Sequence, residues 1–260
     1  MRRGMILGAG SALAMGAGAP GLKILADSAL SPVNVIQGRM GIGAVCLLLV
    51  ALATRRKLSI PRSQWWLVAV YGVVTLAVNH VVFVAALTWM PVGITLLIEY
   101  LAPVFIALWV RFGRGQRLPG ALWVGIAATL VGLALISQVW AGAGLSGIGL
   151  LLALISAVTY AARFLLTEHG LRSHDPIVMA TWGAGLGTVV LLPLERFPFD
   201  RIGADEVGML LWVGVVSMAL GMLLNVGAQR TISSAAASLM ASLEIVIGGA
   251  LAAILLGERL

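Results

Sequence analysis

The chain has 260 residues, of which 60% are hydrophobic and only 10% are charged, whereas soluble domains carry about 25% charged residues. A water-soluble fold cannot bury this much apolar surface, so the composition excludes a soluble globular protein. The net charge of +7 does not indicate a nucleic-acid partner, because the basic residues lie in short connections between apolar stretches. With a single cysteine, Cys46, the chain cannot form an intrachain disulfide.

Apolar stretches recur from one end of the chain to the other. A transmembrane helix needs about 20 consecutive apolar residues. Stretches of about this length predict nine spans, at residues 4–26, 32–53, 64–88, 91–112, 119–138, 145–167, 176–194, 207–229 and 232–256. They predict an all-α fold, a polytopic bundle of transmembrane helices with no separate soluble domain.

The first span, residues 4–26, has two interpretations. Arg2 and Arg3 precede it, as basic residues precede the apolar part of a secretory signal. Pro20 and Lys23 lie inside it, however, and the internal repeat described below requires this stretch as a helix. We therefore expect a retained transmembrane helix.

The same span carries small residues four positions apart, at Gly4, Gly8, Ala12 and Gly16. Small residues at this spacing allow two helices to approach closely, so this face is expected to pack against another helix. A seam that slides between moving groups of helices would need the same surface. Pro20 follows the small face and is a candidate hinge.

Ionisable residues inside the second, third and fourth spans are the first candidates for function, since a charge at the bilayer centre costs about 2.5–3.5 kcal/mol on insertion scales. At a rise of about 1.5 Å per residue, Arg39 lies roughly 10 Å below the outer surface. By the same rise, His80 and Glu99 both lie roughly 12–14 Å deep. Asn79 and Tyr100 add polar groups at this depth.

Two interpretations fit this layer. In the first, Glu99 and His80 line a central cavity, contact a zwitterionic or cationic substrate and exchange protons with it. In the second, Arg39 neutralises Glu99 and holds the second and fourth spans together. Pro103, one turn after Glu99, interrupts the fourth span and is either a hinge or a packed kink.

The later spans contribute further candidates. Tyr160 and Arg163 lie one turn apart in the sixth span, where Arg163 either faces a cavity or extends to the cytoplasmic interface. Glu244 lies near the middle of the ninth span. It either binds substrate or pairs with Asn225, Gln229 or a serine to hold two helices together.

The distribution of Lys and Arg predicts the orientation, because these residues concentrate in cytoplasmic connections. They lie before the first span and after the second, fourth and sixth, at Arg2, Arg3, Arg55, Arg56, Lys57, Arg62, Arg111, Arg114, Arg117 and Arg172. The connections around Asp27, Trp89 and Gly142 carry none, and residues 195–206 mix basic with acidic side chains. We therefore expect a cytoplasmic N-terminus.

An internal repeat appears when the sequence is shifted by 142 positions, which places residues 72–118 on 214–260 without a gap. Both segments begin with GVV, and they end with GQRL and GERL. Chance similarity among apolar helices is the alternative. A five-span repeat has an odd number of crossings, so its second copy is inverted, as in many secondary transporters.

The repeat divides the chain into a five-helix unit at residues 1–138 and a second unit at 145–260, in which four helices are present. A tenth helix would follow Leu260, so the chain is expected to be either truncated, which we favour, or naturally short.

The fourth and ninth spans end in GITLLIEYLAPVFIALWVRFGRGQRL (93–118) and SAAASLMASLEIVIGGALAAILLGERL (234–260). These segments resemble the paired signatures of EamA-type transporters in the drug/metabolite transporter superfamily. IEYLAP and SLEI are most similar to the amino-acid exporter branch. The resemblance implies a ten-helix inverted repeat that transports small metabolites. The chain departs from the family in the missing tenth helix and at Ile245, where the family often has proline.

Together these features predict a secondary transporter that exports amino acids or related metabolites across a bacterial inner or plasma membrane by alternating access. Its partners are then the lipid bilayer and a small-molecule substrate, with protons as a candidate coupling ion. A membrane-embedded enzyme acting on lipid-like substrates and a truncated, non-transporting chain are the alternatives. The sequence contains no phosphate-binding loop, no metal-spaced His and Cys cluster and no Ser, His and Asp arrangement, so we expect no cofactor, no metal and no enzymatic activity.

Overall fold

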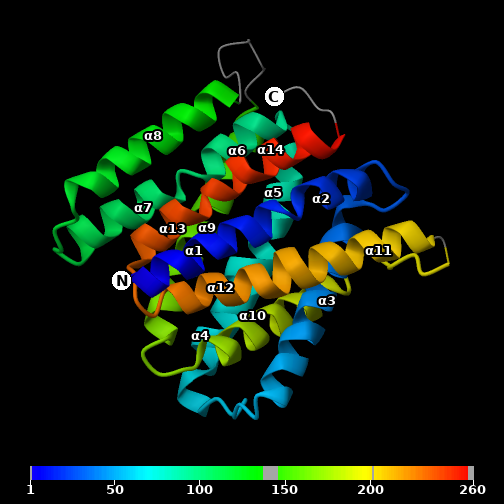
Figure 1. The fold of residues 1–260 in the computed structure, drawn as a ribbon, viewed down its shortest axis with the longest axis horizontal. Helices are drawn as coiled ribbons and strands as arrows, with labels where there is room; N and C mark the ends of the chain where they lie inside the picture. The colour runs from blue at the N-terminus through cyan, green and yellow to red at the C-terminus, as the bar shows by residue number, and fades with distance from the viewer. Residues whose placement is uncertain (1, 137–145, 201, 257–260) are drawn as a thin grey trace.

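The structure is a computed structural model that describes residues 2–136, 146–200 and 202–256, and over these ranges it contains helices and connections but no strand (Figure 1). The all-helical prediction is therefore confirmed. Within the described ranges, seven helical stretches are long and apolar enough to cross a membrane: Arg2–Ala26, Pro32–Ala53, Arg62–Leu87, Val92–Gly113, Gly147–Gly170, Ala204–Ala228 and Ser234–Leu255.

Two shorter apolar helices, Gly120–Leu135 and Pro176–Leu191, occupy the positions of the predicted fifth and seventh spans. Where both ends are described, the helical stretches differ from the nine predicted spans by a few residues. The sixth, for example, ends at Gly170 instead of residue 167. Gly142, part of one predicted connection, and the second GERL motif at 257–260 lie outside the described residues.

The helical stretches are numbered here by the nine predicted spans. Three of them contain a break between two helices. The first contains α1 (Arg2–Gly16) and α2 (Ala19–Ala26), the fourth contains α6 (Val92–Glu99) and α7 (Ala102–Leu108), and the ninth contains α13 (Ser234–Ala241) and α14 (Leu243–Leu256).

Prolines explain two of these three breaks. Pro20 and Pro103 lie in the first turns of α2 and α7, where the missing N–H removes no helical hydrogen bond. The third break, at Ser242, has no proline, and its hydroxyl donates a 2.6 Å hydrogen bond to the Leu239 carbonyl. Backbone groups freed by a break need partners inside a membrane, and Trp212 Nε1 supplies one to the Ala17 carbonyl at 2.9 Å.

The third and eighth stretches each contain a π-helical segment. Segment η2 (Val70–Val78) joins α4 (Trp65–Ala69) to α5 (Asn79–Leu87), and η4 (Val213–Leu220) joins α11 (Ala204–Trp212) to α12 (Gly221–Ala228). The 142-residue shift places residues 70–78 on 212–220, so the two wide turns coincide. Such turns occur often at functional sites.

The remaining elements are α3 (Pro32–Ala53), η1 (Arg62–Gln64), η3 (Trp109–Gly113), α8 (Gly120–Ile136), α9 (Gly147–Gly170) and α10 (Pro176–Leu191). The η2–α5 stretch packs against α9 and α10, whereas the η4–α12 stretch packs against α1 and α3. Each of these two central stretches thus packs against helices of the other predicted repeat unit.

The small face of the first span forms a close contact, as predicted. Gly8 and Gly16 are buried against α13 and α14. A methyl group built on Gly8 would lie 2.8 Å from Met240 Sδ, and one on Gly16 would lie 2.8 Å from Ile247 Cγ2. The Glu244 carbonyl oxygen would also lie 3.0 Å from the methyl group on Gly16, so this position of α1 leaves little room for a side chain.

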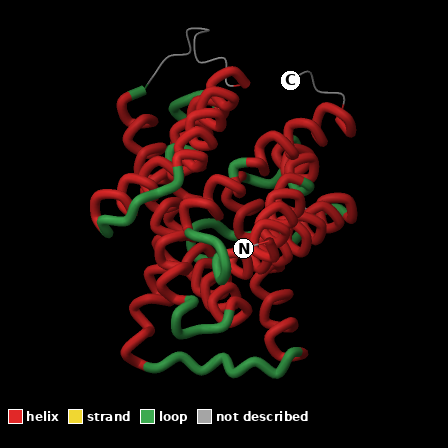
Figure 2. The backbone as a smooth tube through the Cα atoms, turned by 60° about the vertical axis from the view of Figure 1, so that its left-hand side comes forward, coloured by secondary structure: helices red, strands yellow, loops and turns green. Residues whose placement is uncertain are grey.

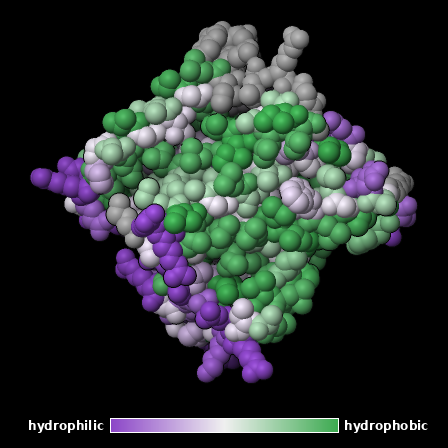
Figure 3. Space-filling model, viewed as in Figure 1, coloured by the Kyte–Doolittle hydropathy of each residue, from purple (hydrophilic) through white to green (hydrophobic). Residues whose placement is uncertain are grey.

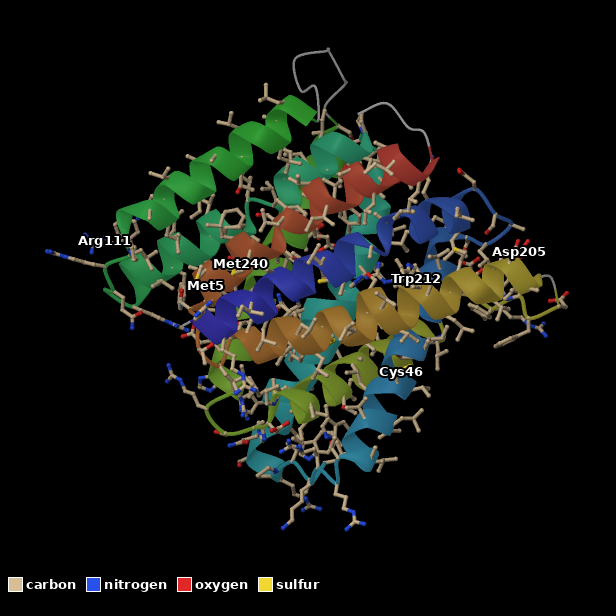
Figure 4. All side chains as sticks on the ribbon, viewed as in Figure 1. Met5, Cys46, Arg111, Asp205, Trp212 and Met240 are labelled. Atoms are coloured by element: carbon tan, nitrogen blue, oxygen red, sulfur yellow. The ribbon has the colours of Figure 1, made fainter. Side chains whose placement is uncertain are left out.

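The surface has the polarity of an integral membrane protein. Large apolar side chains are exposed across the middle of the molecule, including Ile6 at 64%, Val124 at 70% and Val189 at 63%. Figure 3 shows this apolar face with hydrophilic residues gathered at its edges. Arg111 and Asp205 mark opposite ends of the bundle (Figure 4).

Candidate functional site

A cavity of about 370 Å³ lies in the interior of the bundle, a size that suits a small organic molecule. Both halves of the chain line it. Its polar lining consists of Arg39, Tyr71, Asn79, His80, Glu99, Tyr100, Tyr160, Arg163, Asn225 and Glu244. All eight residues predicted to contact substrate are therefore brought together in one place.

The cavity extends toward the end of the bundle with few basic residues. Ala26 at the end of α2, Pro32 at the start of α3 and Leu87 at the end of α5 line it there. Figure 2 shows two groups of helices that diverge toward this end.

Glu99 is the centre of a hydrogen-bonded cluster between α5, α6 and α9. Its Oε1 accepts hydrogen bonds from Ser156 Oγ at 2.6 Å and from Asn79 Nδ2 at 3.2 Å. Asn79 Nδ2 is also within 3.0 Å of Ser156 Oγ and 3.2 Å of Thr159 Oγ1. A buried carboxyl group with such partners keeps a fixed position at the cavity wall.

His80 is oriented by the helix that carries it. Its Nδ1 lies 2.7 Å from the Leu76 carbonyl oxygen. Because a carbonyl can only accept, Nδ1 donates in this bond, and in the neutral ring Nε2 is then the acceptor. His80 lines the cavity one residue after Asn79.

Arg163 lines the same cavity from α9. Its guanidinium carbon lies 4.4 Å from the centre of the Tyr160 ring and 5.2 Å from that of Phe164. These cation–π contacts fix the side chain inside the bundle. The alternative in which Arg163 extends to the cytoplasmic interface is wrong, because sequence position alone does not give the direction of a long side chain.

Arg39 of α3 and Glu244 of α14 both line the cavity. Arg39 interacts electrostatically with Glu244 and Arg163, and Glu244 with Arg39, Arg163 and Glu99. The described ion pairs within 4.0 Å do not include Arg39 with Glu99, so the predicted structural pairing of these two is not observed.

The guanidinium of Arg39 keeps unused hydrogen-bonding capacity. Its Nε is buried and has no hydrogen-bond partner. A buried donor without a partner is costly. An anionic group of a bound molecule could satisfy it.

Sequence reasoning missed Tyr71, Ser156 and Thr159. Small hydroxyl residues are common on helix faces, and nothing in their spacing distinguished Ser156 and Thr159. Asn225 was named only as a partner of Glu244. Here it lines the cavity and accepts a 3.1 Å hydrogen bond from Gln229 Nε2.

Polar contacts join the helices at the end with many basic residues. Glu168 Oε1 lies 2.6 Å from Arg114 Nη1, and its Oε2 accepts a 2.5 Å bond from Ser234 Oγ. These contacts tie α9 to the connection after η3 and to the start of α13. They hold together the end of the bundle opposite the cavity mouth.

No group of three His, Cys, Asp or Glu side chains within the described ranges is arranged to hold a metal ion. The cavity instead combines two arginines, two glutamates, a histidine and three tyrosines with apolar walls. This combination can bind a molecule that carries both charges.

Comparison with known proteins agrees with a transporter. A solved crystal structure of a protein superposes with a TM-score of 0.77 at 22% identity, over 96% of this chain and 87% of that one, which shows a shared fold. The uncharacterized transporter YvbV of Bacillus subtilis (strain 168) is 28% identical over 200 residues, 75% of this chain. An uncharacterized transporter of Clostridium kluyveri is 24% identical over 250 residues, 92% of this chain.

The matched regions span 65% of the length of the Bacillus protein and 80% of the Clostridium protein. The model of the EamA-like transporter family matches residues 2–138 and 147–260. The chain is thus an integral membrane protein that belongs to the EamA-like transporter family.

Proposed function

We propose that this protein is a secondary transporter for amino acids or related small zwitterionic metabolites, which it moves outward through the central cavity. The observation that carries the proposal is that the cavity is lined by two basic and two acidic side chains. Residues 1–138 supply Arg39 and Glu99, and residues 145–260 supply Arg163 and Glu244. Each proposed unit thus contributes one cation and one anion.

A zwitterion would use both signs of charge. Its carboxylate would contact Arg39, whose buried Nε lacks a partner, together with Arg163. Its ammonium group would contact Glu99 and Glu244. Charged groups inside a bilayer are costly and are usually paired with one another. A substrate with both charges would pair with the arginines and the glutamates without adding net charge.

Alternating access between two inverted repeats is the proposed mechanism. Three observations support it. The 142-residue shift superposes the two π-helical segments, and it also superposes the breaks at Tyr100 and Ser242. In addition, η2–α5 and η4–α12 each pack against helices of the other proposed unit. The cavity reaches one end of the bundle while polar contacts join the helices at the other end, which is the arrangement of one of the two alternating states.

The basic residues support a cytoplasmic N-terminus, in an inner or plasma membrane. The cavity mouth then faces outside, as expected for a state from which an exported substrate leaves. The relatives named above are transporters, which favours transport over an enzymatic activity.

Proton coupling through Glu99 or His80 is part of the proposal. Both groups line the cavity, so the arrival of a substrate ammonium group changes the charge beside them. A proton released or taken up by either group would link substrate binding to the proton gradient.

The test measures uptake of radiolabelled amino acids into proteoliposomes across a range of pH values. Glu99→Gln and His80→Ala test coupling, and Gln116→Ala, on the exposed connection after η3, is the control. We expect Glu99→Gln to abolish pH-dependent transport while the control transports normally. An unchanged pH dependence in both cavity variants would remove Glu99 and His80 from any coupling role. Failure of every amino acid to be transported or to compete would remove the substrate class.

A further inference from the structure

A second cavity, of about 350 Å³, lies at the basic end of the bundle. It lies where the first turns of α1, the start of α10 and the last turns of α12 meet. The residues that line it are Arg3, Leu7, Arg56, Asp175, Pro176, Ile177, Leu223, Leu224, Gly227, Arg230 and Thr231. None of them lines the central cavity, so this is a separate site.

Three arginines from distant parts of the chain meet here. Arg56 Nη1 lies 3.4 Å and Arg230 Nη2 lies 3.3 Å from the same oxygen, Asp175 Oδ2. The other oxygen, Asp175 Oδ1, accepts a 3.0 Å hydrogen bond from the Ile177 amide at the start of α10. With Arg3 as the third arginine, the cavity carries three positive charges and one negative charge.

Asp175 orients the arginines without neutralising them. Both Arg56 and Arg230 remain about half exposed, at 48% and 49% of their side-chain surface. A guanidinium has five N–H donors, and one shared carboxylate oxygen uses few of them. The remaining donors suit a phosphate group, which arginine can bind through two parallel hydrogen bonds.

Apart from Thr231, the rest of the cavity wall is apolar. Leu7 of α1 and Leu223 and Leu224 of α12 line it beside Pro176 and Ile177. Figure 3 shows hydrophilic residues near the N-terminal end of α1 bordering the apolar face of the bundle. The site therefore combines a cationic part at the edge of the apolar belt with an apolar part that continues into it.

We propose that this cavity binds the phosphate headgroup of an anionic phospholipid from the leaflet at the basic end, with Arg3, Arg56 and Arg230 on the phosphate and the leucines along the first part of an acyl chain. Basic pockets between transmembrane helices on the cytoplasmic side are suited to anionic headgroups. A soluble phosphate compound would use the arginines but would leave the apolar wall uncovered.

The occupied site joins α1, the connection after α3, α10 and α12. Because α1 and α12 belong to different halves, a lipid bound here links the two halves at the end where the polar contacts of Glu168 also lie. The lipid composition of the membrane would then affect how readily this end opens.

The test is native mass spectrometry of the full chain in detergent, titrated with dioleoylphosphatidylglycerol or with zwitterionic dioleoylphosphatidylcholine. The variants are Arg56→Gln/Arg230→Gln and, because it leaves both Asp175 ion pairs in place, Arg3→Gln. The control is Arg62→Gln/Arg111→Gln, which removes two basic residues of the same end that lie outside the cavity. Thermal unfolding of each variant checks that it folds.

We expect the phosphatidylglycerol adduct to be preferred over phosphatidylcholine and to weaken by about fivefold for each arginine removed from the cavity. The control should bind as the unmodified chain does. Equal binding of the two lipids, or equal losses in the control and cavity variants, would overturn the proposal. If sn-glycerol 1-phosphate or inorganic phosphate bound as tightly as phosphatidylglycerol, the ligand would be a soluble phosphate, and the assignment to a lipid would be overturned.

Discussion

Ser156 donates a 2.6 Å hydrogen bond to Glu99 across the interface between α9 and α6. This bond joins two spans that the 142-residue repeat assigns to different halves of the chain. The acid proposed to bind substrate is thus oriented by a residue of the other half. Relative motion of α6 and α9 would change the hydrogen bonding of Glu99.

Replacing Ser156 with alanine is expected to destabilise the protein and impair transport. The buried Glu99 carboxyl would lose its shortest hydrogen bond, and an unsatisfied buried polar group costs about 1–3 kcal/mol. Thermal unfolding in detergent measures the stability, and proteoliposome uptake measures transport. Thr188→Val is the control, because the Thr188 hydroxyl bonds only its own helix, at the Ala184 carbonyl. Equal effects of both variants would show that Ser156 does not position Glu99.

The contacts of Glu168 are expected to hold the basic end closed. Glu168→Gln removes the ion pair with Arg114, and partly exposed pairs are worth about 0.2–1 kcal/mol. A cysteine placed at Met222, which lines the central cavity, should then react up to about fivefold faster with a maleimide added from the basic side, in a Cys46→Ser background. Arg111→Gln, at the same end, is the control. Unchanged reactivity in Glu168→Gln would mean that this ion pair does not keep that end closed.

Several residues of the candidate cavity could be named from the sequence, but the hydrogen-bond partners of Glu99 could not. Glu99 and His80 stood out because ionisable residues are rare inside apolar spans. Ser156 carries no such signal, since a serine is ordinary on any helix. That it meets Glu99 depends on how α9 packs against α6, which is a property of the tertiary structure.

The helix breaks, too, could be predicted only in part from the sequence. Pro20 and Pro103 predicted two of the breaks, because proline lacks the N–H that would bond to the preceding helical turn. The break at Ser242 carries no proline, and Ile245 gave no indication of it. Its position became meaningful only with coordinates, when it matched the break at Tyr100 after the 142-residue shift.

Alanine at Gly16 is expected to destabilise the protein by about 1–3 kcal/mol through overpacking. Its methyl group would lie 2.8 Å from Ile247 Cγ2 and 3.0 Å from the Glu244 carbonyl oxygen, and a backbone atom cannot move away as a flexible side chain can. Gly185→Ala in α10 is the matched control, because a methyl group there meets no atom within 4 Å. That change should be neutral or stabilise by up to about 1 kcal/mol, the helix propensity difference. Equal thermal midpoints for the two variants would contradict the close packing of α1 on α14.

The orientation of the bundle can be tested with two cysteines at its opposite ends. Gln116, on the exposed connection after η3, lies at the basic end, and Asp205 lies at the other end, in the first turn of α11 (Figure 4). In a Cys46→Ser background, a membrane-impermeant maleimide added to intact cells should label Asp205→Cys and spare Gln116→Cys, because basic connections remain in the cytoplasm. Disrupting the cells should make both sites reactive. If intact cells instead labelled Gln116→Cys alone, the N-terminus would lie outside. The central cavity would then face the cytoplasm in this state, ready to load substrate.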